Sequence, residues 1–318
     1  MSRALICGVT GQDGAYLAAH LLAKGYEVWG TSRDAQTTRA ENLHRLGVAN
    51  RVNLISMAPS DFRSVFTALD RSDPDEIYYL AGQTSVGLSF EQPAEALESI
   101  VSGVLNLLEV LRLRRRTARF FNASSSESFG DTGETAADER TAFRPLSPYG
   151  VAKASAHWLV ANYRDAYGLY ACSGILFNHE SPLRPERFVT QKIIQAAKRI
   201  AAGSDERLTL GRLDIWRDWG WAPEYVDAMW RMLQQDTPQE IVIATGEAHS
   251  LQDFIEEAFA QLDLDWKRYV DVSTDLYRPS DIDRSLGCAA LAEERLGWAA
   301  TKKMRDVARG MHAELPAA

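Results

Sequence analysis

Short apolar runs alternate with longer amphipathic stretches along the first half of the chain. Runs of four to eight residues rich in β-branched and aromatic side chains are typical of buried strands, and stretches with apolar residues on one helical face are typical of helices. The predicted strands are Ala4–Val9, Glu27–Ser32, Val52–Ser56, Glu76–Leu80, Arg119–Ala123, Ala171–Asn178 and Glu240–Ala244. Predicted helices include Tyr16–Ala23, ended by Gly25, and Ala94–Leu113. The pattern predicts an α/β fold with a doubly wound, Rossmann-like parallel sheet.

The regular alternation ends near Asn178, where Pro182 and Pro185 interrupt the pattern. One more strand-like run follows much later and ends in Ala244-Thr245-Gly246. We therefore predict a first domain of residues 1–178 that also takes the strand near 240–246. Residues 179–239 and 247–318 are predicted to form a smaller C-terminal substrate lobe that is interleaved with the sheet.

Composition narrows the possible partners and locations. The 318 residues are 46% hydrophobic, which supports a full core, and their net charge of −8 argues against binding nucleic acid through its phosphates. The three cysteines are far apart without C-x-x-C spacing, so we expect no metal site and no redox pair. The chain starts directly with a short apolar strand, too short for a signal segment or a membrane span. A cytoplasmic protein that does not enter a membrane is expected.

A glycine-rich turn follows the first predicted strand. Its sequence, Gly8-Val9-Thr10-Gly11-Gln12-Asp13-Gly14, has the spacing G-x-x-G-x-x-G where a strand must turn into a helix. Small residues there permit the tight turn, let the backbone approach a pyrophosphate and allow the helix to pack on the sheet. The helix N-terminus then offers free N–H groups to the anion. The turn predicts a bound nicotinamide dinucleotide.

The end of the second predicted strand carries residues that bear on the choice of dinucleotide. An acidic side chain there favours the ribose hydroxyls of NAD, and an arginine accommodates the extra phosphate of NADP. Arg33 and Asp34 stand side by side at this point, so they argue in opposite directions. We favour NADP on the basis of Arg33, with NAD as the alternative.

A second group of candidate residues lies near the middle of the chain. Tyr149 and Lys153 are four residues apart in a helical stretch and therefore share one face. The lysine is expected to lower the pKa of the tyrosine, whose ordinary value of about 10 is too high for a base at neutral pH. Ser125 follows the strand upstream and can bind a substrate oxygen, while Glu127 adds a carboxylate for a second proton transfer.

With these motifs in place, the sequence resembles the GDP-mannose 4,6-dehydratase family of the extended short-chain dehydrogenase/reductases. The likeness covers nearly the whole chain. It rests on Gly8–Gly14 with Tyr16-Leu17, Ser124–Glu127, Ser147–Lys153, Gly174–Pro182, Arg217–Gly220, Ala244–Gly246, Arg278-Pro279 and Leu296–Trp298.

The resemblance implies an NADP-dependent hydro-lyase that converts GDP-mannose to GDP-4-keto-6-deoxymannose for deoxysugar biosynthesis. Ser125, Glu127, Tyr149 and Lys153 are its implied catalytic residues, although the family usually has threonine at the position of Ser125. Tyr149 would take the proton of the sugar C4 hydroxyl while a hydride passes to the nicotinamide. Glu127 would remove the C5 proton, water would leave C6, and the hydride would return to C6.

The resemblance also implies the residues that hold the two ligands. For the cofactor these are Gly8, Thr10, Gly11, Gln12, Asp13, Gly14, Arg33, Leu80, Ala81, Tyr149, Lys153 and His179. For the nucleoside diphosphate sugar they are Asn178, Val189, Lys192, Arg217 and Arg278 in the second lobe, where His179 and Glu180 are also candidates for stiffening the loop between lobes. A homodimer or homotetramer is expected.

Departures from the family pattern keep other readings open. The differences include Met57-Ala58-Pro59 after the third strand, Arg33-Asp34 in place of paired arginines, Leu146, Gln191 and Arg212. They surround the expected nucleotide and sugar positions, so a dehydratase for another NDP-hexose is an alternative. An NDP-sugar 4-epimerase or 4-keto reductase uses the same Ser-Tyr-Lys group, but Glu127 argues against it. A non-catalytic NADP-binding sensor is a remote alternative, because Tyr149, Lys153 and the glycine turn are all present.

Overall fold

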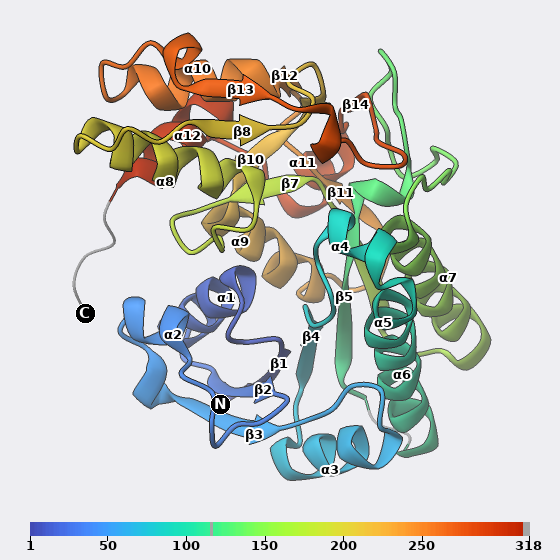
Figure 1. Cartoon of the computed structure of the whole chain (residues 1–318). Helices are drawn as coiled ribbons and strands as arrows, with labels where there is room; N and C mark the ends of the chain where they lie inside the picture. The colour runs from blue at the N-terminus through green and yellow to red at the C-terminus, as the bar shows by residue number, and fades with distance from the viewer. Residues whose placement is uncertain (115–116, 314–318) are drawn as a thin grey trace.

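A seven-stranded parallel sheet forms the centre of the protein in this computed structural model, which describes residues 1–114 and 117–313. Its strands run in the order β11-β6-β5-β4-β1-β2-β3 (Figure 1). They are β1 (Arg3–Cys7), β2 (Glu27–Ser32), β3 (Val52–Ser56), β4 (Glu76–Tyr79), β5 (Arg119–Ser125), β6 (Ala171–Leu176) and β11 (Ile241–Ile243). All seven predicted strands are present in this sheet, which confirms the predicted fold class.

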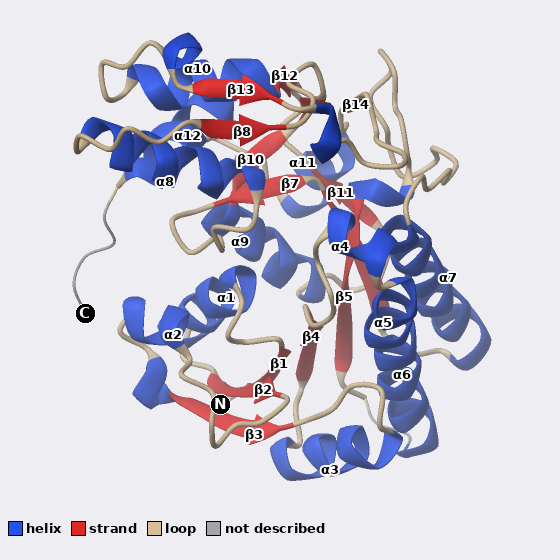
Figure 2. Cartoon of the chain, in the orientation of Figure 1, coloured by secondary structure: helices blue, strands red, loops and turns tan. Residues whose placement is uncertain are grey.

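Helices cover both faces of the sheet (Figure 2). Successive residues of a strand point to opposite faces, and β1 illustrates this: Ile6 is buried with the helices of one face, and Leu5 with those of the other. On the Ile6 face lie α1 (Gln12–Ala23), α2 (Glu41–Arg45), α9 (Ala222–Leu233) and α11 (Ala290–Leu296). On the Leu5 face lie α3 (Phe62–Ser72), α6 (Gly103–Arg114) and α7 (Pro148–Tyr167), with the short helices α4 (Val86–Glu91) and α5 (Pro93–Leu97) beside α7.

Two predicted helices differ in detail from the structure. Helix α1 starts at Gln12, four residues before the predicted start, and Gly25 follows its end with φ +83°, as expected for a helix-terminating glycine. The predicted single helix Ala94–Leu113 is α5 and α6 joined by a π-helical segment, Glu98–Ser102. The Tyr79 hydroxyl donates a hydrogen bond to the Ser99 carbonyl at 2.6 Å, and this tertiary contact takes up a carbonyl within the π-helical segment.

The chain leaves the sheet at the end of β6. The prediction of one strand over Ala171–Asn178 is wrong at its end, because Asn178–Glu180 forms β7 and pairs with β10 in a separate small sheet. The second region also contains α8 (Val189–Ala201), β8 (Leu208–Leu210), β9 (Trp216–Arg217), β10 (Trp219–Trp221), β12 (His249–Ser250), α10 (Leu251–Ala260), β13 (Val270–Val272), β14 (Arg284–Ser285) and α12 (Met304–His312). It has its own core, built largely from α8, α10 and α12.

Strand β11 returns from this second region to pair with β6, so the two parts of the chain are interleaved as expected. The predicted domain boundaries themselves stay a prediction, as do the cytoplasmic location and the homo-oligomer. Among residues 1–114 and 117–313, no helix is both long and apolar enough to cross a membrane.

Candidate active site

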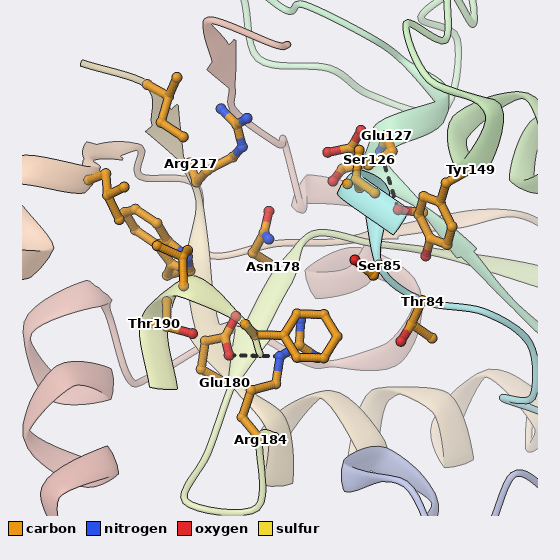
Figure 3. A pocket seen from close by; sticks show the side chains of 18 of the residues that line it. Thr84, Ser85, Ser126, Glu127, Tyr149, Asn178, Glu180, Arg184, Thr190 and Arg217 are labelled. Atoms are coloured by element: carbon orange, nitrogen blue, oxygen red, sulfur yellow. Dashed lines mark hydrogen bonds and ion pairs between the residues drawn. The ribbon is translucent and has the colours of Figure 1, made fainter. Parts of the chain in front are cut away.

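A cavity of about 420 Å³ opens at the carboxyl ends of the sheet strands, between the sheet and the second region (Figure 3). Its size falls within the range of small-molecule sites, and its place is where ligands bind in open α/β sheets. Twelve of the predicted site residues line it: Asp13, Leu80, Ser125, Glu127, Tyr149, Lys153, Asn178, His179, Val189, Lys192, Arg217 and Arg278. The others, Gly8, Thr10, Gly11, Gln12, Gly14, Arg33 and Ala81, lie outside its wall, on the glycine turn and at the ends of β2 and β4.

The glycine turn has the close backbone packing that a dinucleotide site requires. A Cβ placed on Gly14 would lie 2.3 Å from the Gly8 carbonyl oxygen, and Gly8 itself adopts φ +88° against the backbone of Leu80 and Ala81. Gly11 occupies the N-cap position of α1 and has no side chain to cap the helix. First-turn N–H groups of α1 are therefore available to an anion, and the turn fits a pyrophosphate.

Asp34 is engaged in its own loop. Its carboxylate accepts hydrogen bonds from the backbone N–H of Gln36 at 2.9 Å and from the Thr37 hydroxyl at 2.8 Å. These contacts lower the pKa of the Asp34 carboxyl. Arg33 is exposed, and no hydrogen bond or ion pair joins it to another residue of the described chain. The Asp34 carboxylate is therefore engaged in hydrogen bonds within its loop, whereas the Arg33 guanidinium group has no such partner among the described residues.

An ion pair links the glycine turn to the second region. His179 of β7 contacts the Asp13 carboxylate through Nε2 at 3.0 Å, and its Nδ1 lies 2.7 Å from the Phe177 carbonyl oxygen. Burial favours the neutral form of each partner, but their mutual attraction outweighs it. The pKa of Asp13 is lowered to about 2, and that of His179 is raised. Gln12 adds a hydrogen bond from its side chain to the His179 carbonyl at 3.1 Å.

Ser125 and Glu127 stand where β5 ends. The Ser125 hydroxyl accepts the Glu127 backbone N–H at 3.3 Å and so starts a short 3₁₀ turn. Burial raises the pKa of Glu127, while the positive charges of Arg217 and Arg278 act in the opposite direction. A carboxylate whose pKa is raised is a stronger base than an ordinary one.

Tyr149 and Lys153 lie on the first turns of α7. Ser147 caps this helix by accepting the Gly150 N–H at 3.0 Å, and Pro148 occupies its first position. The expectation that Lys153 lowers the pKa of Tyr149 is wrong for this structure: burial raises the pKa of Tyr149 to about 12, although the Ser125 hydroxyl acts to lower it. The physical reason is the burial of the phenol; Lys153 Nζ stands 5.7 Å from the tyrosine ring centre and donates to the Ala123 carbonyl at 2.7 Å.

Burial also lowers the pKa of Lys153, to about 8. A lysine in this range is close to releasing its proton at neutral pH, so it can serve in proton exchange as well as in orienting groups. The contact with Ala123 fixes its ammonium group between β5 and α7.

The expected substrate residues form the opposite side of the cavity. Figure 3 shows Arg217 across the cavity from Tyr149, with Asn178 between them. Arg217 is 5% exposed and is held by the Trp216 and Ile282 carbonyls, while Lys192 Nζ donates to the Thr209 carbonyl at 3.0 Å. Val189 is the first residue of α8, whose N-cap, Phe188, makes no side-chain cap. Cationic side chains and an uncapped helix N-terminus thus share this wall.

Sequence reasoning missed several lining residues. Arg184 lies 3.0 Å from the buried carboxylate of Glu180, and Thr190 faces the same carboxylate (Figure 3). Asp281 accepts hydrogen bonds from both Arg217 and Arg278. Four-residue spacing from Glu180 to Arg184 and three-residue spacing from Arg278 to Asp281 are signals that could have suggested these pairs.

Arg212, one of the departures from the family pattern, also lines the cavity. Its guanidinium group pairs in a two-pronged arrangement with Asp214 and reaches Asp283 at 2.5 Å. Neighbouring carboxylates therefore already hold this arginine in place at the cavity rim.

This chain is similar to known proteins over most of its length. The profile of the family described as GDP-mannose 4,6 dehydratase matches residues 5–311. The chain is 44% identical over 305 residues to GDP-mannose 4,6 dehydratase 2 of Arabidopsis thaliana, covering 93% of this chain and 82% of that protein.

Solved structures share the fold over nearly the whole chain. A UDP-glucose 4-epimerase of Thermus thermophilus in complex with NAD has a TM-score of 0.84 at 25% identity, covering 98% of this chain and 99% of that one. RMD of Pseudomonas aeruginosa, complexed with NADPH, has a TM-score of 0.80 at 22% identity, covering 99% of each chain. On the strength of the profile match and the sequence identity, this chain belongs to the GDP-mannose 4,6-dehydratase family.

Proposed function

We propose that this protein is a GDP-mannose 4,6-dehydratase, a hydro-lyase that forms GDP-4-keto-6-deoxymannose. The observation that carries the proposal is the presence of Glu127 in the same cavity as Ser125, Tyr149 and Lys153. Oxidation at one carbon requires only the hydroxyl, the phenol and the lysine. The extra carboxylate supplies the second proton transfer that elimination of water requires.

Tyr149 acts on the C4 hydroxyl of the sugar. Its oxygen takes the hydroxyl proton, and Ser125, which acts on the same phenol, donates a hydrogen bond to the C4 oxygen. The glycine turn and Lys153 would hold an oxidised dinucleotide, which when bound would supply the hydride acceptor and donor and a positive ring that would favour the Tyr149 phenolate. The hydrogen bond to the Ala123 carbonyl holds the Lys153 ammonium group at the end of the cavity that contains Tyr149.

Glu127 carries out the elimination. A 4-keto group acidifies the C5 hydrogen, which the Glu127 carboxylate removes as a proton. Its raised pKa then lets the carboxyl group give that proton to the departing C6 hydroxyl, which leaves as water. The proton count closes when C5 takes up the proton that Tyr149 removed from the C4 hydroxyl.

The diphosphate of the substrate fits the opposite wall of the cavity. Arg217, Arg278 and Lys192 supply positive charge, and the N-terminus of α8 supplies free N–H groups. Asn178 lies between this wall and the catalytic residues, so it is placed to contact the sugar end (Figure 3).

We further propose that the dinucleotide is NADP rather than NAD. Support comes from Arg33, which is exposed at the end of β2, and from Asp34, whose carboxylate is taken up by its own loop. A ribose-binding acid accepts the hydroxyls through its carboxylate, and the Asp34 carboxylate already accepts hydrogen bonds from Gln36 and Thr37.

Incubation with a panel of NDP-hexoses and a catalytic amount of dinucleotide tests this function. GDP-mannose should yield a 4-keto-6-deoxy product by mass spectrometry, with a loss of one water and no net reduction of the dinucleotide. Another NDP-hexose converted in preference would identify a different substrate. Inversion at C4 without loss of water would instead favour a 4-epimerase.

A further inference from the structure

Two cationic side chains of the substrate wall converge on one carboxylate oxygen. Asp281 Oδ1 accepts hydrogen bonds from Arg217 Nη2 and from Arg278 Nη1, each at 3.1 Å, and from the backbone N–H of Ile282 at 2.9 Å. Its side chain is 15% exposed, and Arg217 is 6% exposed by the same measure. Asp281 therefore lies in the cavity wall beside the two arginines, largely shielded from solvent.

The two arginines differ in how they are otherwise held. Arg217 also donates to two backbone carbonyls, those of Trp216 and Ile282. Arg278 is 33% exposed, and Asp281 is the one ion-pair or hydrogen-bond partner of its guanidinium group among residues 1–114 and 117–313. The position of Arg278 therefore depends mainly on this carboxylate.

The same carboxylate acts on the general base. Glu127 experiences the positive charges of Arg217 and Arg278 and the negative charge of Asp281, and its charge in turn acts on Tyr149. Two cations beside a carboxylate favour its ionised form and weaken it as a base. One additional negative charge offsets part of that effect.

From these contacts, and on the basis of the proposed dehydratase function, we propose that Asp281 is a positioning residue that anchors Arg217 and Arg278 for the diphosphate and balances their charge at Glu127. It does not itself touch the reacting atoms. Its two tasks are separable, because the anchoring needs an acceptor oxygen and the charge balance needs the negative charge.

Two substitutions separate the tasks. Asp281→Asn keeps an acceptor oxygen but removes the charge, so the acid limb of the pH–kcat profile should move to lower pH by roughly 0.5–1 unit, with KM for GDP-mannose changed by less than about threefold. Asp281→Ala removes the oxygen as well. It should weaken GDP binding by about tenfold or more, as measured by calorimetry, and leave the weak binding of guanosine unchanged.

Asp271→Asn is the matched control. Asp271 of β13 forms a two-pronged pair with Arg207 at 2.6 Å, outside the cavity lining. Asp271→Asn also removes a carboxylate charge beside an arginine, but outside the cavity. GDP binding and the pH–kcat profile should therefore keep their parental values. Asp281→Glu, which restores the charge on a longer side chain, should return the acid limb towards the parental pH.

An Asp281→Asn profile that superimposes on the parental one would contradict the charge balance, and unchanged GDP affinity in Asp281→Ala would contradict the anchoring. Thermal unfolding of each variant shows whether it is folded. If Asp281→Ala is not folded, the pH–kcat profile of Asp281→Asn remains the test of the proposal. Failure of the parental protein to convert GDP-mannose would contradict the proposed function instead. Calorimetry with GDP would still decide the anchoring, because it requires no turnover.

Discussion

His179 Nε2 lies 3.0 Å from the Asp13 carboxylate, so a residue of β7 is bonded to the turn that follows β1, 166 positions away in the sequence. The His179 ring also stacks on Tyr225 of α9, with ring centres 4.5 Å apart. The glycine turn is therefore held from the second region as well as by its own backbone.

Stability should depend on pH through this pair. The pKa of Asp13 is about 2 in the folded protein against an ordinary 3.8, so its contribution is present above about pH 4 and is lost as the pH falls towards 2. The pKa of His179 is raised above 6.5, so its contribution is complete below that pH and is lost as the pH rises through the raised value. Asp13→Asn should therefore lower the free energy of unfolding most between about pH 4 and 6.5, by ~1–3 kcal/mol.

Urea unfolding of the parental protein and Asp13→Asn at about pH 5.5 and about pH 9 measures this difference. It should be smaller at the higher pH. His249→Gln is the control, because the His249–Glu247 pair is long, 3.7 Å, and its carboxylate is half-exposed. A difference for Asp13→Asn that does not change with pH would show that the pair is not ionised.

Alanine substitutions at two glycines of the turn should have different effects, one on stability and the other on dinucleotide binding. In Gly14→Ala the new Cβ meets backbone atoms at 2.3 and 2.6 Å, so the variant should lose ~1–3 kcal/mol or more of stability. In Gly11→Ala the nearest such atom is 3.4 Å away, so the fold should persist. Dinucleotide affinity should nevertheless fall, because the methyl group occupies the approach of the pyrophosphate.

Thermal unfolding and dinucleotide titration of both variants check this expectation. Gly133→Ala, at a glycine with open space around it but φ +55°, controls for backbone strain alone. Full dinucleotide binding by Gly11→Ala would place the pyrophosphate elsewhere.

Arg33→Ala tests the choice of dinucleotide. Loss of one charge-assisted contact to the 2′-phosphate should weaken NADP binding by about ten- to a hundredfold and leave NAD binding nearly unchanged. Arg39→Ala removes an exposed arginine of the same loop and serves as the control. Equal losses for NADP and NAD in Arg33→Ala would show that Arg33 does not read the phosphate.

Tyr149→Phe removes only the ionisable oxygen. The fold and dinucleotide binding should remain nearly intact, while turnover should fall by roughly 10²–10⁴-fold. Tyr163→Phe on the same helix is the matched control, because the Tyr163 hydroxyl contacts Glu109 at 2.5 Å and lies outside the cavity lining. Turnover by Tyr149→Phe within a few fold of the parental rate would rule out Tyr149 as the active base.

Local pattern was enough to predict the sheet and the glycine turn. All seven strands were predicted from short apolar runs, since residues buried on both faces leave a continuous signal in the sequence. The break between β6 and β7 was placed too late, because Asn178 directly follows the buried run that ends at Phe177. The pairing of Asn178–Glu180 with β10, which separates this segment from β6, is a tertiary contact.

The electrostatics of the site depend on contacts that spacing does not encode. The four-residue spacing placed Tyr149 and Lys153 on one face of α7, but the Ala123 carbonyl of β5 decides where the ammonium group points. The contact of Asp281 with Arg217 was missed for the same reason, since the two residues are 64 positions apart. Tertiary partners of this kind are invisible to a reading of local periodicity.

Glu127→Gln is expected to separate oxidation from elimination. Ser125, Tyr149 and Lys153 remain, so the C4 hydroxyl should still be oxidised and bound dinucleotide should become partly reduced on mixing with GDP-mannose. Elimination should stall, at a cost of roughly 10²–10⁴ in rate for a lost general base. Glu139→Gln is the control: burial also raises the pKa of Glu139, but its side chain accepts the Val242 N–H outside the cavity lining.

The dehydratase function is tested most directly by one rapid-mixing experiment with Glu127→Gln and GDP-mannose. It records the absorbance of reduced dinucleotide and the amount of 4-keto-6-deoxy product over time. Reduced dinucleotide should accumulate while product formation falls by at least about 10²-fold. Product formation at nearly the parental rate, with no accumulation of reduced dinucleotide, would contradict this expectation and make the Glu127 carboxylate a structural group.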